Sequence, residues 1–201
     1  MLLFISCGST GDDIMEEYTQ DNTQNSLALY FLGDSIIDYW NDVDDYFPSY
    51  KCYNYGVTRT GINTFLSKVN LATLKGTTCI IEIGTNDMKQ VISENRFDEY
   101  VRDYINVLSS LEAKKIYLLS LLPRNRAIDN FDYNSHYPSM NEKINNEVSI
   151  HLDNVTYINI YDKFLKDGVI NKAYTYDGLH PNALGYKLIA DVLNSYLKDY
   201  K

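Results

Sequence analysis

The chain has little cysteine, few basic residues and no long apolar run, and each shortage excludes a class of protein. Three cysteines in 201 residues are too few for a disulfide scaffold, so buried free thiols are expected at Cys52 and Cys79. Lys and Arg number 18 against 27 Asp and Glu, and the net charge of -9 with no basic stripe excludes nucleic acid and anionic membrane surfaces as expected partners. No stretch is long enough to span a bilayer as a helix. The length and the 45% hydrophobic content instead fit one globular domain with a sizeable core.

The first 25 residues differ in composition from the rest. Residues 1–7 are apolar and end in a small residue before Cys7, which resembles the end of a bacterial lipoprotein signal peptide with a lipid on Cys7. The run lacks a positively charged start and is short. A start codon placed too late would explain both features, and an ordinary hydrophobic N-terminus is the alternative. Residues 8–25 are polar and are expected to form a flexible tether. We therefore expect a cell-envelope or secreted location, with Cys7 as the only membrane attachment, and a cytoplasmic location as the alternative.

Residues 26–201 alternate strand patterns with helix patterns, which predicts an α/β domain with helices on both faces of a parallel sheet. Apolar runs predict strands at 26–33, 50–55, 77–83, 114–121 and 154–160. Amphipathic or capped segments predict helices at about 36–46, 61–73, 93–112, 136–151 and 181–199. We expect Ser93 near the cap of the third helix and Pro181 at or near the first turn of the last.

Four junctions that follow predicted strands or precede a helix carry glycine and polar residues of catalytic types. Each alone is common turn chemistry, but together and in this order they predict a site at the carboxyl edge of the sheet. The four blocks are Gly33-Asp34-Ser35, Asn54-Tyr55-Gly56, Gly84-Thr85-Asn86-Asp87 and Asp177-Gly178-Leu179-His180-Pro181.

With these blocks the chain resembles the SGNH/GDSL esterase and lipase family over residues 26–201. The four residues that give the family its name match Ser35, Gly56, Asn86 and His180. The resemblance implies a flavodoxin-like three-layer α/β/α fold with a five-stranded parallel sheet. It also implies ester hydrolysis that needs neither a metal nor a cofactor. No Gly-x-Ser-x-Gly elbow surrounds Ser35, which separates the chain from the other common serine-hydrolase fold.

The chemistry also follows from the residue types. The Ser35 hydroxyl needs a base, and the His180 imidazole can take its proton and return it to the leaving alcohol. Asp177 lies three residues before His180, and Gly178 allows the tight turn that would bring its carboxylate to the other ring nitrogen. The expected oxyanion donors are the backbone N–H groups of Ser35 and Gly56 and the side chain of Asn86.

Other titratable residues are expected to serve the structure. The position of Asp34 is structural in the family that the chain resembles, and Asp87 is expected to be a turn or cap residue. The predicted helix at 136–151 places His136 and His151 in structural or solvent-facing positions. Glu82 interrupts the central strand, where a buried carboxylate requires hydrogen bonds. It either orients the Asn86 loop or has a purely structural role.

Two residues and one loop are candidates for substrate contact. Arg59 stands where the family usually has a smaller residue, and it either contacts an anionic or polyhydroxylated substrate or is a surface arginine in a salt bridge. Trp40 either lines the same wall or caps the core. The polar and aromatic segment 123–138 is long enough to form a substrate wall.

These features predict a serine esterase that removes small acyl groups, acetyl above all, from a carbohydrate through an acyl-enzyme. The 19 tyrosines suit a sugar ligand, because their rings are apolar and their tips polar. A lysophospholipase or thioesterase of the same family is one alternative. A glycan-binding module that keeps the fold without turnover is the other.

Overall fold

The computed structural model describes residues 27–125 and 130–198, and the predicted tether and Cys7 lie outside this part of the chain. Its centre is a five-stranded sheet with the order β2-β1-β3-β4-β5, in which every neighbouring pair is parallel. The strands are β1 (Leu27–Gly33), β2 (Tyr50–Gly56), β3 (Thr78–Glu82), β4 (Lys115–Leu119) and β5 (Val155–Ile158). This is the flavodoxin strand order, so the predicted fold is confirmed.

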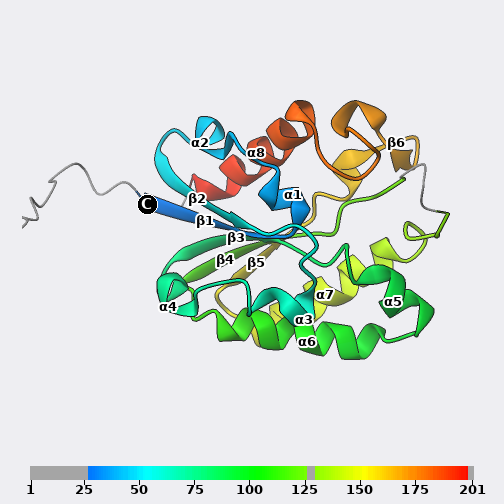
Figure 1. The fold of residues 1–201 in the computed structure, drawn as a ribbon, viewed down its shortest axis with the longest axis horizontal. Helices are drawn as coiled ribbons and strands as arrows, with labels where there is room; N and C mark the ends of the chain where they lie inside the picture. Colours follow the sequence, from blue (N-terminus) through cyan, green and yellow to red (C-terminus); the bar gives the residue numbers. More distant parts are fainter. Residues whose placement is uncertain (1–26, 126–129, 199–201) are drawn as a thin grey trace, which may run out of the picture.

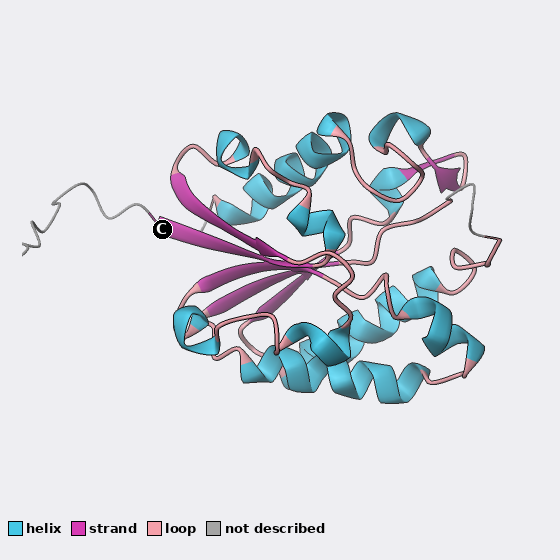
Figure 2. Ribbon diagram, viewed as in Figure 1, coloured by secondary structure: helices cyan, strands magenta, loops and turns pink. Residues whose placement is uncertain are grey.

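Helices cover both faces of the sheet and give the molecule three layers (Figures 1 and 2). One face carries α1 (Ser35–Asp38), α2 (Val43–Tyr46) and α8 (Ala183–Leu197). The other carries α3 (Ile62–Phe65), α4 (Leu71–Leu74), α5 (Met88–Ser93), α6 (Phe97–Ser110) and α7 (Tyr137–His151). The segment between β5 and α8 adds short pieces: the 3-10 turns η1 (Asp162–Phe164) and η2 (Lys172–Tyr174), and the hairpin strands β6 (Leu165–Lys166) and β7 (Val169–Ile170).

The central strand β3 is buried along its whole length, and this explains its continuous apolar run. Cys79 and Ile81 belong to the core under α6 and α7, whereas Ile80 belongs to the core under α1 and α8. Cys52 and Cys79 are buried free thiols, as predicted, and burial raises the pKa of Cys79 to about 11. Within the described residues, no helix is both long and apolar enough to cross a membrane.

The helix predictions were wrong in segments where a turn divides the predicted helix into two. The segments 36–46 and 61–73 each form two short helices in place of one. Ser93 ends α5 and does not cap the next helix. Asn95 takes a left-handed φ of 52° between the two helices, and α6 begins at Phe97. Pro181 precedes the Asn182 cap of α8, whose side chain accepts hydrogen bonds from two backbone N–H groups of that helix.

The carboxyl ends of β1 and β3 lie side by side in the sheet. After β1 the chain adds β2 on one side, and from β3 onward it adds strands on the other side, so the crossovers leave this point in opposite directions. In open α/β sheets this crevice is the usual ligand site. Close approach is possible because Gly33 has no side chain: a Cβ there would lie 1.9 Å from the backbone oxygen of Glu82.

Candidate active site

Ser35 is the first residue of α1 and follows directly after the Gly33-Asp34 turn that ends β1. Asp34 caps this helix, because its Oδ1 accepts a hydrogen bond of 2.9 Å from the Ile36 N–H. The cap fixes Ser35 at the carboxyl edge of the sheet, where its side chain is mostly buried but still reaches the surface.

His180 and Asp177 come from the loop before α8 and complete a hydrogen-bonded chain with Ser35. Ser35 Oγ lies 3.0 Å from His180 Nε2, and His180 Nδ1 lies 3.0 Å from Asp177 Oδ2. The other carboxylate oxygen of Asp177 accepts the backbone N–H groups of Leu179 and His180, at 3.1 and 2.9 Å. Gly178, with a left-handed φ of 82°, allows this tight turn.

The carboxylate of Asp177 is held in its charged form. Partial burial raises its pKa, but the hydrogen bonds from the backbone and imidazole of His180 and from Leu179 lower it more, so that the pKa lies below its usual value. The loop is also anchored from outside, since the Asn125 N–H donates to the Gly178 oxygen over 2.7 Å. A charged carboxylate in a fixed turn therefore faces the imidazole.

Asn86 lies in the loop after β3, and its side chain bonds to the segments that follow β1 and β2. Its Nδ2 donates to the backbone oxygen of Thr60 at 2.9 Å and to Asp34 Oδ2 at 3.2 Å. The structure thus joins the loops that follow β1, β2 and β3 through one side-chain amide. Asp34 contributes to both the nucleophile helix and this amide, which is a structural role as predicted.

The Gly56 N–H, an expected oxyanion donor, has an acceptor within the protein. It donates to Asn54 Oδ1 at 2.9 Å, and Asn54 Nδ2 in turn donates to the backbone oxygens of Ile37 and Trp40. The glycine is needed for packing, because a Cβ at this position would lie 2.2 Å from the Asp38 nitrogen. The oxyanion role of Gly56 stays a prediction, because its N–H would have to leave Asn54 Oδ1 to reach a substrate oxygen.

Two buried carboxyl groups lie near Ser35: Asp34 precedes it in the chain, and Glu82 pairs with Gly33 between β1 and β3. Burial is the main cause that raises the pKa of both Asp34 and Glu82 above the usual carboxyl range, and the charge of Asp34 adds to the effect on Glu82. Among the described residues, no partner within hydrogen-bond distance is found for either carboxyl oxygen of Glu82. Glu82 therefore makes no hydrogen bond to the Asn86 loop and is best described as a neutral, buried acid.

The two candidate substrate contacts have different positions. Trp40 is fully buried and stacks on Tyr186 with ring centroids 4.9 Å apart, so it is a core residue and cannot line a substrate wall. Arg59 is exposed in the loop after β2, with a left-handed φ of 65°. That loop also carries Thr60, the backbone acceptor of Asn86, so the Arg59 backbone lies beside the candidate site.

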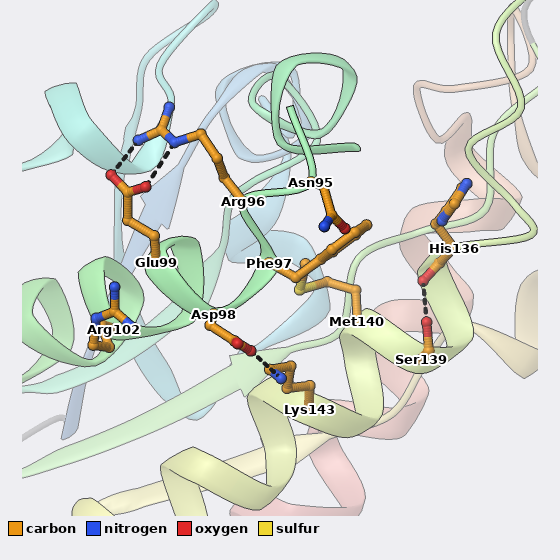
Figure 3. A pocket seen from close by; sticks show the side chains of 10 residues that line it. All are labelled: Asn95, Arg96, Phe97, Asp98, Glu99, Arg102, His136, Ser139, Met140 and Lys143. Atoms are coloured by element: carbon orange, nitrogen blue, oxygen red, sulfur yellow. Dashed lines mark hydrogen bonds and ion pairs between the residues drawn. The ribbon is translucent and has the colours of Figure 1, made fainter. Parts of the chain in front are cut away.

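The remaining candidate residues have structural contacts. Asp87 Oδ2 accepts the Ile62 N–H at 2.8 Å and the Tyr100 hydroxyl at 3.2 Å, which links α3, α5 and α6. His136 stacks on Phe97 beside a hollow of about 690 Å³ between α6 and α7 (Figure 3). None of the predicted site residues lines this hollow, and two of its cations are paired, Arg96 with Glu99 and Lys143 with Asp98.

One residue beside His180 was missed by the sequence analysis. The ring of Tyr39 lies 5.0 Å from the imidazole of His180, centroid to centroid. Its spacing of four residues from Ser35 was the available signal, because residues i and i+4 share one face of a helix. In the part of the chain that the structure describes, no group of three or more His, Cys, Asp or Glu side chains could hold a metal ion.

Comparisons with known proteins identify the family and related sequences. The model of the GDSL-like Lipase/Acylhydrolase family matches residues 31–188. Over 204 aligned residues the chain is 30% identical to the N-acylneuraminate cytidylyltransferase of Escherichia coli O18:K1:H7 (strain RS218 / NMEC), covering 92% of this chain and 43% of that protein. The chain thus spans less than half of that relative.

Solved structures share the fold. A provisionally named platelet activating factor from Streptococcus pneumonia has a TM-score of 0.72 at 24% identity, covering 89% of this chain and 86% of its own. A GDSL-like lipase from Bacteroides thetaiotaomicron VPI-5482 has a TM-score of 0.64 at 20% identity, covering 88% and 90%. A mutant of an acetyl-xylooligosaccharide esterase from Geobacillus Stearmophilus has a TM-score of 0.63 at 15% identity, covering 86% and 93%.

The family match covers most of the chain, and within it Ser35 and His180 are in hydrogen-bond contact. The chain therefore belongs to the GDSL-like lipase/acylhydrolase family and is a carboxylic ester hydrolase.

Proposed function

We propose that the protein hydrolyses small acyl esters, acetyl above all, that are carried on a carbohydrate. The observation that supports this most is the chain of 3.0 Å contacts from Ser35 Oγ through His180 to Asp177 Oδ2. A serine hydroxyl in such a chain can transfer its proton to the imidazole as it attacks a carbonyl carbon. The carboxylate opposite holds the imidazole with Nε2 directed at the hydroxyl.

The proposed reaction has two halves. Ser35 Oγ bonds to the carbonyl carbon while its proton passes to His180 Nε2. The tetrahedral intermediate then expels the alcohol, which takes that proton from His180, and leaves an acyl group on Ser35. Water attacks this acyl-enzyme with His180 again as the base, and the carboxylic acid leaves as Ser35 recovers its proton.

Two groups are proposed to stabilise the negative oxygen of the intermediate. They are the backbone N–H of Ser35, at the start of α1, and the side-chain amide of Asn86. Asn86 can serve the oxyanion by sharing the hydrogen that now points to Asp34 Oδ2, which is the longer of its two contacts at 3.2 Å. The Gly56 N–H remains a further candidate donor, which like the Asn86 amide would exchange a bond within the protein for one to the oxyanion.

The comparisons guide the choice of carbohydrate. One structural relative is named an acetyl-xylooligosaccharide esterase, and the curated relative is named for N-acylneuraminate, an acidic sugar. The exposed guanidinium of Arg59, on the rim loop after β2, is a suitable partner for a sugar carboxylate. Acetylated N-acylneuraminate is therefore the first substrate to test, followed by acetylated xylan, pectin and peptidoglycan fragments.

Acetate release from this panel, compared between wild type and Ser35→Ala, tests the proposal. We expect acetate from at least one glycan, none from Ser35→Ala, and full activity in Ser109→Ala, a control on the exposed face of α6. A fluorophosphonate should label wild type at Ser35. A Ser35→Ala protein that releases acetate normally would refute the assignment.

Arg59→Ala tests the role of the guanidinium. If Arg59 binds a sugar carboxylate, the variant raises KM for an acidic acetyl ester and leaves KM for a neutral one unchanged. Unchanged KM values for both esters would place Arg59 outside the substrate site.

The alternatives predict other outcomes. A lysophospholipase or thioesterase would keep or gain activity on nitrophenyl octanoate relative to the acetate, whereas an acetylesterase loses activity steeply with chain length. A glycan-binding module without turnover would bind acetylated glycans but would not react with a fluorophosphonate.

The lipid anchor at Cys7 is a separate proposal about location. It rests on residues 1–7 alone, which lie outside the described residues. Labelling of the protein with palmitate in the producing bacterium, lost in Cys7→Ser, would support it, and equal labelling of both forms would contradict it.

A further inference from the structure

Tyr39 is an exposed aromatic residue fixed beside the catalytic histidine. It follows α1 directly, and its N–H donates to the Ser35 oxygen at 3.1 Å, which continues the turn that begins at the nucleophile. Its ring lies 5.0 Å from the His180 ring at an angle of 45°, yet 46% of the residue is open to solvent. A large apolar ring therefore faces outward at the reacting centre.

The position of the Tyr39 ring next to His180 indicates which part of an ester substrate it would contact. His180 returns its proton to the leaving alcohol, so the alcohol part of the substrate must lie on the side of the imidazole. The acyl group stays on Ser35 and points away from that proton. A residue that contacts the imidazole ring from outside therefore borders the alcohol part of the ester.

We propose that Tyr39 is a specificity-determining residue whose ring packs against the sugar ring of the alcohol part of the substrate. This rests on the proposed function and names the part of the substrate that is recognised. The face of a pyranose is lined with C–H groups that pack on an aromatic ring, while the Tyr39 hydroxyl can bond a sugar hydroxyl.

A second aromatic residue lies on the same loop as the histidine. The Tyr176 N–H donates to the His180 oxygen at 3.0 Å, and the residue is 75% exposed. Tyr176 is thus a second exposed tyrosine whose backbone bonds to that of His180.

The experiment compares acetyl esters with different alcohol parts. Triacetin has no ring, acetylated xylobiose carries a neutral sugar ring, and the methyl glycoside of O-acetyl-N-acetylneuraminate carries an acidic one. We expect Tyr39→Ala to lower kcat/KM for at least one sugar ester about tenfold and for triacetin less than twofold. Tyr39→Phe should keep most of the activity on sugars.

Tyr196→Ala is the matched control. Tyr196 is 41% exposed, similar to Tyr39, but it lies near the far end of α8, about 20 Å along the helix from the loop that carries His180. This variant should leave these rates unchanged.

Binding separates recognition from catalysis. In a Ser35→Ala background, Tyr39→Ala should weaken binding of the same sugar ester about tenfold by calorimetry. An equal loss on triacetin and sugar would overturn the inference, because Tyr39 would then act by positioning His180. Unchanged sugar kinetics would overturn it as well, and so would the absence of sugar binding to the Ser35→Ala protein.

A different result would contradict the proposed function itself: wild type would hydrolyse neither triacetin nor any sugar ester and would not react with the fluorophosphonate. The role of Tyr39 fails if wild type hydrolyses triacetin and a sugar ester and the variant keeps the ratio between them.

Discussion

Replacing Asp177 by Asn tests the proposed triad with little change of shape. In the structure one carboxylate oxygen of Asp177 accepts the backbone N–H groups of Leu179 and His180, and the other accepts the ring at Nδ1. The amide oxygen of Asn can keep the two backbone bonds. Its NH₂ group then faces Nδ1, and two donors cannot share that contact.

The imidazole is expected to respond by moving its proton to Nε2. That nitrogen lies 3.0 Å from Ser35 Oγ and would then donate to the hydroxyl, so it could no longer accept the proton. In a serine protease this exchange lowers kcat about 10⁴-fold, which corresponds to about 5 kcal/mol of activation free energy. We expect a loss of the same order for Asp177→Asn.

Steady-state hydrolysis of 4-nitrophenyl acetate measures the loss, and thermal unfolding checks the fold. The melting temperature should change little, since the loop keeps its backbone bonds. Asp191→Asn is the control, because Asp191 forms an exposed ion pair with Lys187 on α8. A kcat within tenfold of wild type in a folded Asp177→Asn protein would refute the assignment of Asp177.

Three further predictions concern the oxyanion, the buried acids and the core. Asn86→Ala is expected to lower kcat about 10²–10³-fold on the same ester, and a loss under tenfold would show that other groups hold the oxyanion. Burial raises the pKa of Asp34 to about 7 and that of Glu82 well above its usual value, so between about pH 4 and 7 the folded state binds more protons than the unfolded chain. The free energy of unfolding should therefore fall as pH rises through this window, and Glu82→Gln should reduce the fall in urea titrations at pH 5 and 8; an unchanged slope would contradict this. Trp40→Ala, which empties a fully buried site, should cost about 3–5 kcal/mol of unfolding free energy by circular dichroism, whereas Tyr196→Ala should cost little.

The sheet and the contacts that join Ser35, His180 and Asp177 were predictable because most of their signals are local. A strand buried on both faces is a continuous apolar run, as in β1 and β3, and helix-bearing crossovers make such strands parallel. Asp177 and His180 lie three residues apart around a glycine, so their contact needs only one turn. The meeting of that loop with Ser35 followed from the rule that parallel strands end at one edge.

The errors concern groups whose role depends on distant neighbours. Trp40 could not be placed from its position near Ser35, because its burial depends on Tyr186, which lies 146 positions further along the chain. The contact between Asn54 Oδ1 and the Gly56 N–H, in contrast, is local, and the Asn-x-Gly turn was its available signal. The short helices between residues 35 and 74 likewise reflect packing on the sheet, which overrides local propensity.

The reactivity of the two buried thiols, Cys52 and Cys79, can be used to measure how often the domain unfolds. Alkylating reagents react with the thiolate form of cysteine and must reach its sulfur. While β3 stays in the sheet, Cys79 is buried and its raised pKa keeps it a thiol, so it should not react. Its modification rate, read by peptide mass spectrometry, should therefore follow rare opening of the whole domain, whereas Cys52 on the edge strand β2 should react earlier as that edge frays. The unmodified chain thus contains separate reporters of global and local unfolding.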